Sequence, residues 1–302
     1  MTSNSLPSRR PAGWMAIDFG AGLAQRLGAI MSARAGGISQ ASYAQCNLGD
    51  HVQDDPQAVA HNREVFAAQL QARPAWLTQV HGNRMIRLTN GASGGDLFNP
   101  VDVQGSDGQP EADGALTTEP GLACTVMVAD CLPLLLAAPE GRGVAALHAG
   151  WRGLAGAGAG AMAGRGIVHT GVAALCEAAS CDPAELRVWL GPCIGPQHFE
   201  VGADVLIGFG VDPREALPHP RFTPSDPALY SKGGEAAADD QRGAQPKWLA
   251  DLPGLARDIL QSCGVEHISG GTWCTVSDAS RFFSFRRDRV TGRQAAGICL
   301  RG

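Results

Sequence analysis

The sequence lacks the long apolar run, of about 18 residues, that a membrane-spanning helix needs, and its first residues lack the apolar stretch of a signal peptide. Its nine cysteines are odd in number and include no Cys-x-x-Cys pair, so they do not indicate a disulfide framework. Lys and Arg are scattered, and the net charge is -5, which argues against nucleic acid and acidic membranes as partners. We therefore expect a cytoplasmic protein with a small ligand.

What is present is a chain of 302 residues, 44% of them apolar, which is enough for a full hydrophobic core. Residues 1–13 are polar and predict a disordered tail, whereas residues 14–302 show no repeat or clean boundary and predict one domain. Short apolar runs alternate with turn-rich connections, which favours an α+β fold with mixed strands and outer helices. Strands are predicted over residues 75–79, 85–89, 114–118, 123–129, 134–138, 144–148, 187–191, 271–275 and 294–300.

Three segments carry helix signals. Asp55 as N-cap, with Pro56 after it, begins a predicted helix that ends at Leu70. A second helix, rich in glycine, is predicted from about residue 154 to 179. A third spans about residues 252–263 and ends before a glycine. Residues 91–112 and 233–246 are rich in small and polar residues and predict surface loops.

Two histidines and one cysteine stand at turn-like interruptions of apolar runs. His81 lies between two predicted strands, Cys131 follows one, and His148 ends one before a glycine-marked turn. Strand ends can deliver such side chains to a common cleft. Zinc takes neutral imidazole and thiolate, and three protein ligands leave the fourth position for water or substrate. The set therefore predicts a catalytic zinc site, although its long-range spacing matches no local zinc motif.

The same three residues permit other chemistry. Cys131 would serve as a nucleophile with His81 or His148 as its base. One copper ion with Met85 or Met127 as a weak axial ligand is also compatible with the set. Several coppers are not, because the eight histidines include no His-x-His pair. A purely structural zinc is disfavoured, since structural sites usually have four protein ligands.

Further polar residues are candidates for substrate binding. Arg34, in a glycine-containing turn, and Arg152, just before a helix, would hold phosphate, or else are solvated surface arginines. Asn47 would orient a ribose hydroxyl or a base edge, or is an ordinary turn residue. Asp130 would support a metal ligand or act as a general acid, or else caps the next turn. Asp113 is interpreted as a turn former.

Four motifs in order resemble the YfiH family, also called laccase-domain or multicopper polyphenol oxidase family proteins. They are residues 79–82 (QVHG), 129–131 (ADC), 148–153 (HAGWRG) and 190–195 (LGPCIG). The resemblance implies an α/β/β/α sandwich with a metal in a cleft at the strand ends, and zinc at His81, Cys131 and His148. Phe199 and Phe285 stand where the family often has Tyr, so any role of a tyrosine hydroxyl is absent here.

The resemblance also implies a function. We expect a zinc-dependent purine nucleoside phosphorylase that acts on adenosine, inosine and methylthioadenosine, with purine nucleoside and phosphate as its partners. Adenosine deamination is a second activity attributed to the family, although the Pro-Cys-x-x-Cys part of the deaminase signature is absent. The alternatives are a copper polyphenol oxidase and an amidase that edits peptidoglycan precursors. The sequence leaves the oligomeric state open.

Overall fold

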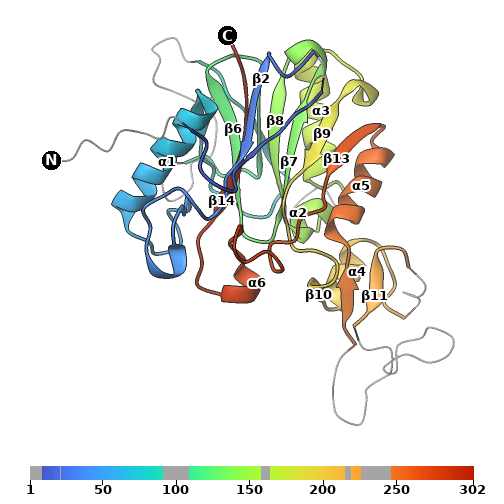
Figure 1. The fold of residues 1–302 in the computed structure, drawn as a ribbon. Coiled ribbons are helices and arrows are strands. Elements are labelled where there is room, and N and C mark those ends of the chain that lie inside the picture. Colours follow the sequence, from blue (N-terminus) through green and yellow to red (C-terminus); the bar gives the residue numbers. More distant parts are fainter. Residues whose placement is uncertain (1–8, 21, 91–108, 158–163, 215–218, 226–245) are drawn as a thin grey trace.

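Two β-sheets stacked face to face form the body of the protein (Figure 1). The computed structural model describes residues 9–20, 22–90, 109–157, 164–214, 219–225 and 246–302. The five-stranded sheet has the order β1 (Met15–Ala16), β2 (Leu27–Met31), β14 (Gln294–Leu300), β6 (Leu122–Val128), β3 (Arg73–Ala75). The six-stranded sheet has the order β13 (His267–Gly270), β9 (Arg187–Leu190), β7 (Leu132–Ala137), β8 (Val144–Ala149), β5 (Gly114–Thr117), β4 (Met85–Arg87).

Helices cover the outer face of each sheet. Helix α1 (Pro56–Leu70) packs on the five-stranded sheet, and α3 (Ile167–Ala179) and α5 (Leu252–Ser262) pack on the six-stranded sheet (Figure 1). A small antiparallel sheet, β10 (Glu200–Val201), β12 (Trp248–Ala250) and β11 (Phe222–Pro224), lies beside α4 (Ala203–Gly208). Short helices α2 (Trp151–Ala155) and α6 (Phe285–Asp288) lie near one end of the sheets. The predicted α/β/β/α sandwich is confirmed.

Alternating side chains divide the core into layers. In β7, Leu134 and Leu136 face the helices, whereas Leu135 faces the other sheet. In β6, Val126 lies between the sheets and Met127 faces α1. Strand side chains point to opposite faces with a period of two, so a strand covered on both faces must be apolar throughout. The near-continuous apolar character of β6 and β7 therefore reflects their central position.

Most of the predicted elements are found. Strands β4, β5, β6, β7, β8, β9 and β14 occupy the predicted segments within one or two residues at their ends. The Asp55 side chain accepts a hydrogen bond from the Gln57 backbone N–H at 3.0 Å, as expected for an N-cap. Helix α5 also begins where predicted. None of the helices in the described ranges is long and apolar enough to cross a bilayer.

Three predictions of local structure are wrong. The strand predicted at 75–79 ends at Ala75, because the following residues turn away towards the cavity described below. No strand occupies residues 271–275; the strand of this region, β13, lies before them and ends at Gly270, which has a φ of +74°. The helix predicted from 154 to 179 is two helices: α2 ends at Gly156, whose φ of +70° is left-handed, and α3 begins at Ile167. Strand β2 was not predicted.

Both predicted loops and the predicted tail lie largely outside the described residues, which exclude 1–8, 91–108 and 226–245. The end of the first loop is described, and there the Gln109 amide donates to Asp50 Oδ2 at 2.8 Å. At the start of the chain, the Pro11 carbonyl accepts from the Trp14 backbone N–H at 3.2 Å. The single-domain boundary at residue 14 stays a prediction.

Candidate metal centre and its cavity

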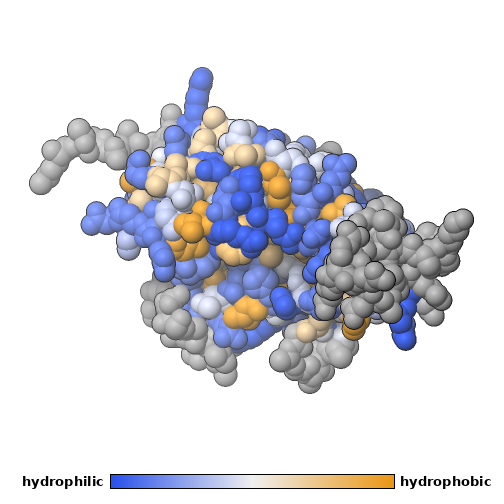
Figure 2. All heavy atoms as spheres, turned by 90° about the horizontal axis from the view of Figure 1, so that it is seen from below, coloured by the Kyte–Doolittle hydropathy of each residue, from blue (hydrophilic) through white to orange (hydrophobic). Residues whose placement is uncertain are grey.

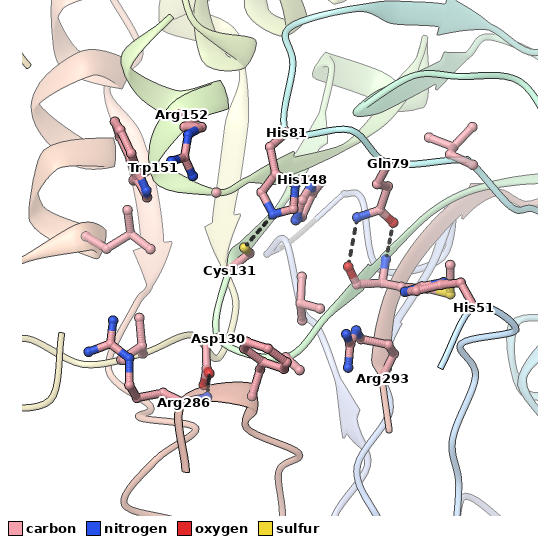
Figure 3. A pocket seen from close by; sticks show the side chains of 18 of the residues that line it. His51, Gln79, His81, Asp130, Cys131, His148, Trp151, Arg152, Arg286 and Arg293 are labelled. Atoms are coloured by element: carbon pink, nitrogen blue, oxygen red, sulfur yellow. Dashed lines mark hydrogen bonds between the residues drawn. The ribbon is translucent and has the colours of Figure 1, made fainter. Parts of the chain in front are cut away.

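The three predicted ligands meet at one end of the sandwich. The Cys131 Sγ atom lies 3.6 Å from His81 Nε2, and the ring centroids of His81 and His148 are 4.7 Å apart (Figure 3). Candidate ligand atoms of all three residues lie within 4.8 Å of one another. Zn–N bonds of about 2.0 Å and Zn–S bonds of about 2.3 Å in a tetrahedron place nitrogen and sulfur about 3.5 Å apart. The cluster therefore has the spacing of a metal site.

Strand pairing explains why residues so distant in sequence meet. Strands β7 and β8 are antiparallel neighbours, and Pro133, two residues after Cys131, lies opposite His148. His81 comes from the loop between β3 and β4 and has a left-handed φ of +61°. The Gln79 side chain fixes this loop on β6, because it exchanges two hydrogen bonds of 2.8 Å with the backbone of Met127.

The buried carboxylate of Asp113 holds two of the three ligands. It lies 2.8 Å from His148 Nδ1, and it accepts hydrogen bonds from the backbone N–H groups of Val80, His81 and Gly82 at 3.2, 2.9 and 2.6 Å. A histidine whose Nδ1–H donates to a carboxylate presents Nε2 as a ligand, an arrangement common at metal sites. The interpretation of Asp113 as a simple turn former is therefore wrong.

The cluster is electrostatically coupled. Burial alone would raise the pKa of the Cys131 thiol, but the charge of His148 and hydrogen bonds from both histidines outweigh it and lower this pKa to about 6. Burial would lower the pKa of His148, but the neighbouring Cys131 and Asp113 raise it to about 9. In the metal-free protein, the side chains of Cys131 and His148 therefore form a thiolate–imidazolium pair near neutral pH.

Gly150 leaves room for the cluster. A Cβ atom on this residue would lie 2.5 Å from His81 Cδ2 and 3.1 Å from Cys131 Sγ. We expect Gly150→Ala to displace the His81 ring. Overpacking of this kind costs about 1–3 kcal/mol, so zinc binding should weaken about 10-fold or more. Chelator competition measures the affinity, and an affinity equal to that of the wild type would show that the ring tolerates the methyl group.

A cavity of about 660 Å³ opens over the cluster, a size typical of small-molecule sites. Trp151 and Arg152 lie on one side of the cluster, and Gln79, His51 and Arg293 lie on the other (Figure 3). Arg286 also lies on the Trp151 side (Figure 3), and its guanidinium is 5.6 Å from the ring centroid of Phe199, which lines the cavity too. The cavity thus has an aromatic arm, defined by Trp151 and Phe199, and a polar arm, defined by Gln79, His51 and Arg293.

Two further predicted site residues line this cavity. Arg152 is exposed, and its guanidinium lies over the Trp151 ring at 4.4 Å from the centroid. Asp130 directly precedes Cys131, but its carboxylate accepts from the Thr275 hydroxyl and from the Arg286 backbone N–H, each at 2.6 Å. The Asp130 carboxylate thus ties helix α6 to the cluster loop, and it makes no hydrogen bond to His81 or His148 within the described ranges.

The structure places Arg34 and Asn47 away from the cavity wall. Asn47 is fully buried, and its Oδ1 accepts from the backbone N–H groups of Gly49 and Arg293 at 2.9 and 2.8 Å. The Arg34 guanidinium lies 4.9 Å from the Phe283 ring centroid and 3.8 Å from Asp288. Burial lowers the pKa of Arg34, although Asp288 opposes this shift. Neither residue lines the cavity.

Sequence reasoning missed Asp113, Arg286 and Arg293. The last two line the cavity, and Arg293 lies directly before β14. Residues 286–293 contain four arginines, and nothing local distinguishes the two that reach the cavity. For Asp113 the sequence offers one signal. It directly precedes the strand predicted at 114–118, and His81 and His148 also stand at the ends of predicted strands.

The end of the molecule near α6 is mostly hydrophilic. Figure 2 shows this view, in which apolar residues form small separate patches among polar ones. Exposed apolar side chains in the described ranges include Val80 and Phe285, each 47% exposed. Phe285 lines the cavity and His81 next to Val80 belongs to its cluster, so part of this apolar surface surrounds the cavity.

These features define a four-layer sandwich protein with a candidate three-ligand metal centre in a cavity of small-molecule size. The family model of the multi-copper polyphenol oxidoreductase laccase matches residues 28–301. The chain belongs to this family, and the resemblance to YfiH proteins that its motifs predict is confirmed.

Curated relatives and solved structures agree over nearly the whole chain. A purine nucleoside phosphorylase of Pseudomonas aeruginosa is 38% identical over 288 residues, covering 95% of this chain and 98% of that protein. The purine nucleoside phosphorylase YfiH of Escherichia coli is 39% identical, covering 90% and 93%. The crystal structure of YlmD from Geobacillus stearothermophilus superposes with a TM-score of 0.77 at 27% identity, covering 98% and 99%.

Proposed function

We propose that this protein is a zinc-dependent purine nucleoside phosphorylase that acts on adenosine, inosine and methylthioadenosine. The observation that carries the proposal is the cluster of His81, Cys131 and His148 in a cavity with an aromatic and a polar arm. The names of the relatives from P. aeruginosa and E. coli support phosphorolysis of purine nucleosides as the reaction.

The donor set favours zinc. Two imidazole nitrogens and a thiolate suit this ion, and the carboxylate of Asp113 behind His148 is the outer support that zinc-binding histidines commonly have. Copper would need a weak axial ligand, but the Sδ atom of Met127, the cavity's methionine, is contacted by Arg63 at 3.8 Å. When bound, zinc supplies Lewis-acid charge to an oxygen in the fourth position.

The reaction assigns a task to each arm. An oxygen of phosphate forms a bond to C1′ of the ribose, and the bond from C1′ to N9 breaks. The base leaves with the electron pair and takes a proton, so the products are a free purine and a sugar 1-phosphate. Trp151 and Phe199 offer flat apolar surface for the base. Positive charge develops on the sugar in such reactions, and a cavity that orients both reactants lowers the barrier.

Most of the remaining predicted residues do not contact the substrate in this scheme but position residues that do. Asp130 holds Arg286 and α6 at the cavity wall, so we assign it a positioning role; general acid catalysis would require it to release one of its two hydrogen bonds. Asn47 Oδ1 accepts a hydrogen bond from the backbone N–H of Arg293 and so fixes the position of that residue. Arg152 lies over the Trp151 ring in the aromatic arm, where its exposed guanidinium is available to contact substrate oxygens. Arg34 packs on the Phe283 ring, and neither of these two residues lines the cavity.

The test is release of free base from adenosine, inosine and methylthioadenosine by protein of known zinc content, with and without phosphate. Chromatography should show adenine or hypoxanthine and a sugar phosphate, formed only when phosphate is present. Conversion of adenosine to inosine without phosphate would reveal the additional deaminase activity. No base release from fully zinc-loaded protein would contradict the proposal, and oxidation of phenols by a copper-loaded sample or hydrolysis of peptidoglycan precursors would replace it.

A further inference from the structure

The guanidinium of Arg293 lines the cavity but has unused hydrogen-bond donors. The Arg293 NH1 atom donates to the backbone carbonyls of Thr291 and Gly292 at 3.1 and 3.2 Å. Its Nε–H and its other terminal nitrogen make no hydrogen bond to any residue that the structure describes, and it forms no ion pair with an Asp or Glu there. The side chain is only partly exposed. A cation in this position has donors and charge available for an anion.

Other arginines of the structure have acidic partners. Arg63 lies 3.1 Å from Asp50, and Arg221 lies 3.0 Å from Asp251. Arg286 also lines the cavity and, like Arg293, donates through NH1 to two backbone carbonyls, those of His198 and Glu200, but it lies on the Trp151 side of the cluster (Figure 3). A partly buried charge is costly unless a partner compensates it. Burial lowers the pKa of Arg293, and the nearby Cys131 and Asp130 oppose that shift, which places the guanidinium in the field of the metal cluster.

The position of Arg293 is built into the fold. Its backbone N–H donates to the buried Asn47 Oδ1, and the missing side chain of Gly49 makes room for it, since a Cβ there would lie 2.7 Å from Arg293 Cγ. In Figure 3 the guanidinium points into the cavity from the side of His51 and Gln79. The donors are therefore held on the polar arm, across the cluster from Trp151.

We propose that Arg293 is the residue that binds the inorganic phosphate co-substrate, in the polar arm of the cavity. Its planar fork matches two phosphate oxygens, and the aromatic arm remains for the purine. This assignment rests on the proposed phosphorylase function for the identity of the anion. A nucleotide phosphate has the same chemistry, and the experiment below separates the two sources.

Calorimetric titration of inorganic phosphate into zinc-loaded protein tests the proposal without turnover. The variant is Arg293→Gln, and the matched control is Arg26→Gln. Arg26 is exposed and donates to the Glu140 carbonyl in the turn between β7 and β8, at the far end of β7 from Cys131. We expect phosphate binding to weaken by about 10- to 100-fold in Arg293→Gln, the range for lost charge-assisted hydrogen bonds, and to stay unchanged in Arg26→Gln.

Kinetics add a second readout. The KM for phosphate should rise in Arg293→Gln while the KM for inosine stays constant, and Arg293→Lys should recover part of the loss. Equal zinc content and equal unfolding midpoints show that the variants fold. Phosphate binding that is unaffected by Arg293→Gln, or weakened as much by Arg26→Gln, would overturn the assignment. So would an Arg293→Gln variant that binds inosine 5′-monophosphate more weakly but inorganic phosphate as tightly as the wild type does. Arg293-dependent phosphate binding without base release would retain the anion site and reject the phosphorylase.

Discussion

Replacing Cys131 with alanine should remove the metal ion and reduce phosphate-dependent base release by about 1,000-fold or more. The thiolate is one of three ligands, and its pKa of about 6 keeps it charged at neutral pH without help from the metal. Two histidines alone make a much weaker site, and loss of Lewis-acid assistance removes several kcal/mol of transition-state stabilisation. Metal analysis together with the base-release assay measures both effects.

The matched control for this variant is Cys176→Ala. Cys176 lies on α3 and is half-buried, and burial raises the pKa of its thiol to about 12. We expect this variant to keep its zinc and its activity. Cys131→Ala protein that still binds one equivalent of zinc would contradict the ligand assignment. Activity that survives zinc removal but not loss of the thiol would instead support the nucleophile interpretation of Cys131.

The second large effect is expected at Asp113, which touches no substrate. Asp113→Asn should weaken zinc binding by about 10- to 100-fold, because the carboxylate behind His148 is what fixes the presentation of Nε2. Asp113→Ala should lower the free energy of unfolding as well, by about 3–5 kcal/mol, since it leaves the partner of a buried charge pair and three backbone N–H groups unpaired.

Chelator competition and urea unfolding of the metal-free protein separate these two effects. Asp258→Asn is a suitable control, because Asp258 forms an ion pair with Arg221 on the surface and has no contact with the cluster. Its zinc affinity should equal that of the wild type. If Asp113→Asn binds zinc as tightly as the wild type does, the orientation of His148 does not depend on this carboxylate and the account of the cluster fails.

Periodicity in the sequence predicts most of the fold, with instructive exceptions. Strands such as β6 and β7 are apolar throughout because both of their faces are covered. Strand β2 has the same fully buried pattern but contains Gly28, which weakens the strand signal; a Cβ there would lie 2.8 Å from Cys299 Sγ, so the close packing of β14 explains the glycine. Such a contact between distant segments cannot be read from local sequence.

The candidate site is predicted in its ligands but not in its supports. His81, Cys131 and His148 carry recognisable chemistry, whereas Asp113 acts through hydrogen bonds to residues 31 to 35 positions away. The sequence also does not show whether a candidate residue is buried or reaches the cavity. Asn47 is a candidate for substrate contact in the sequence, or else a turn residue, and the structure buries it behind Arg293, the residue that reaches the cavity.

The most direct test of the central claim is a zinc titration of the metal-free wild-type protein, with phosphate-dependent release of hypoxanthine from inosine measured at each step. Activity should be absent at first, rise linearly with added zinc and saturate at one equivalent. Full activity without metal, or no activity at one equivalent of bound zinc, would contradict a metal-dependent phosphorylase at His81, Cys131 and His148.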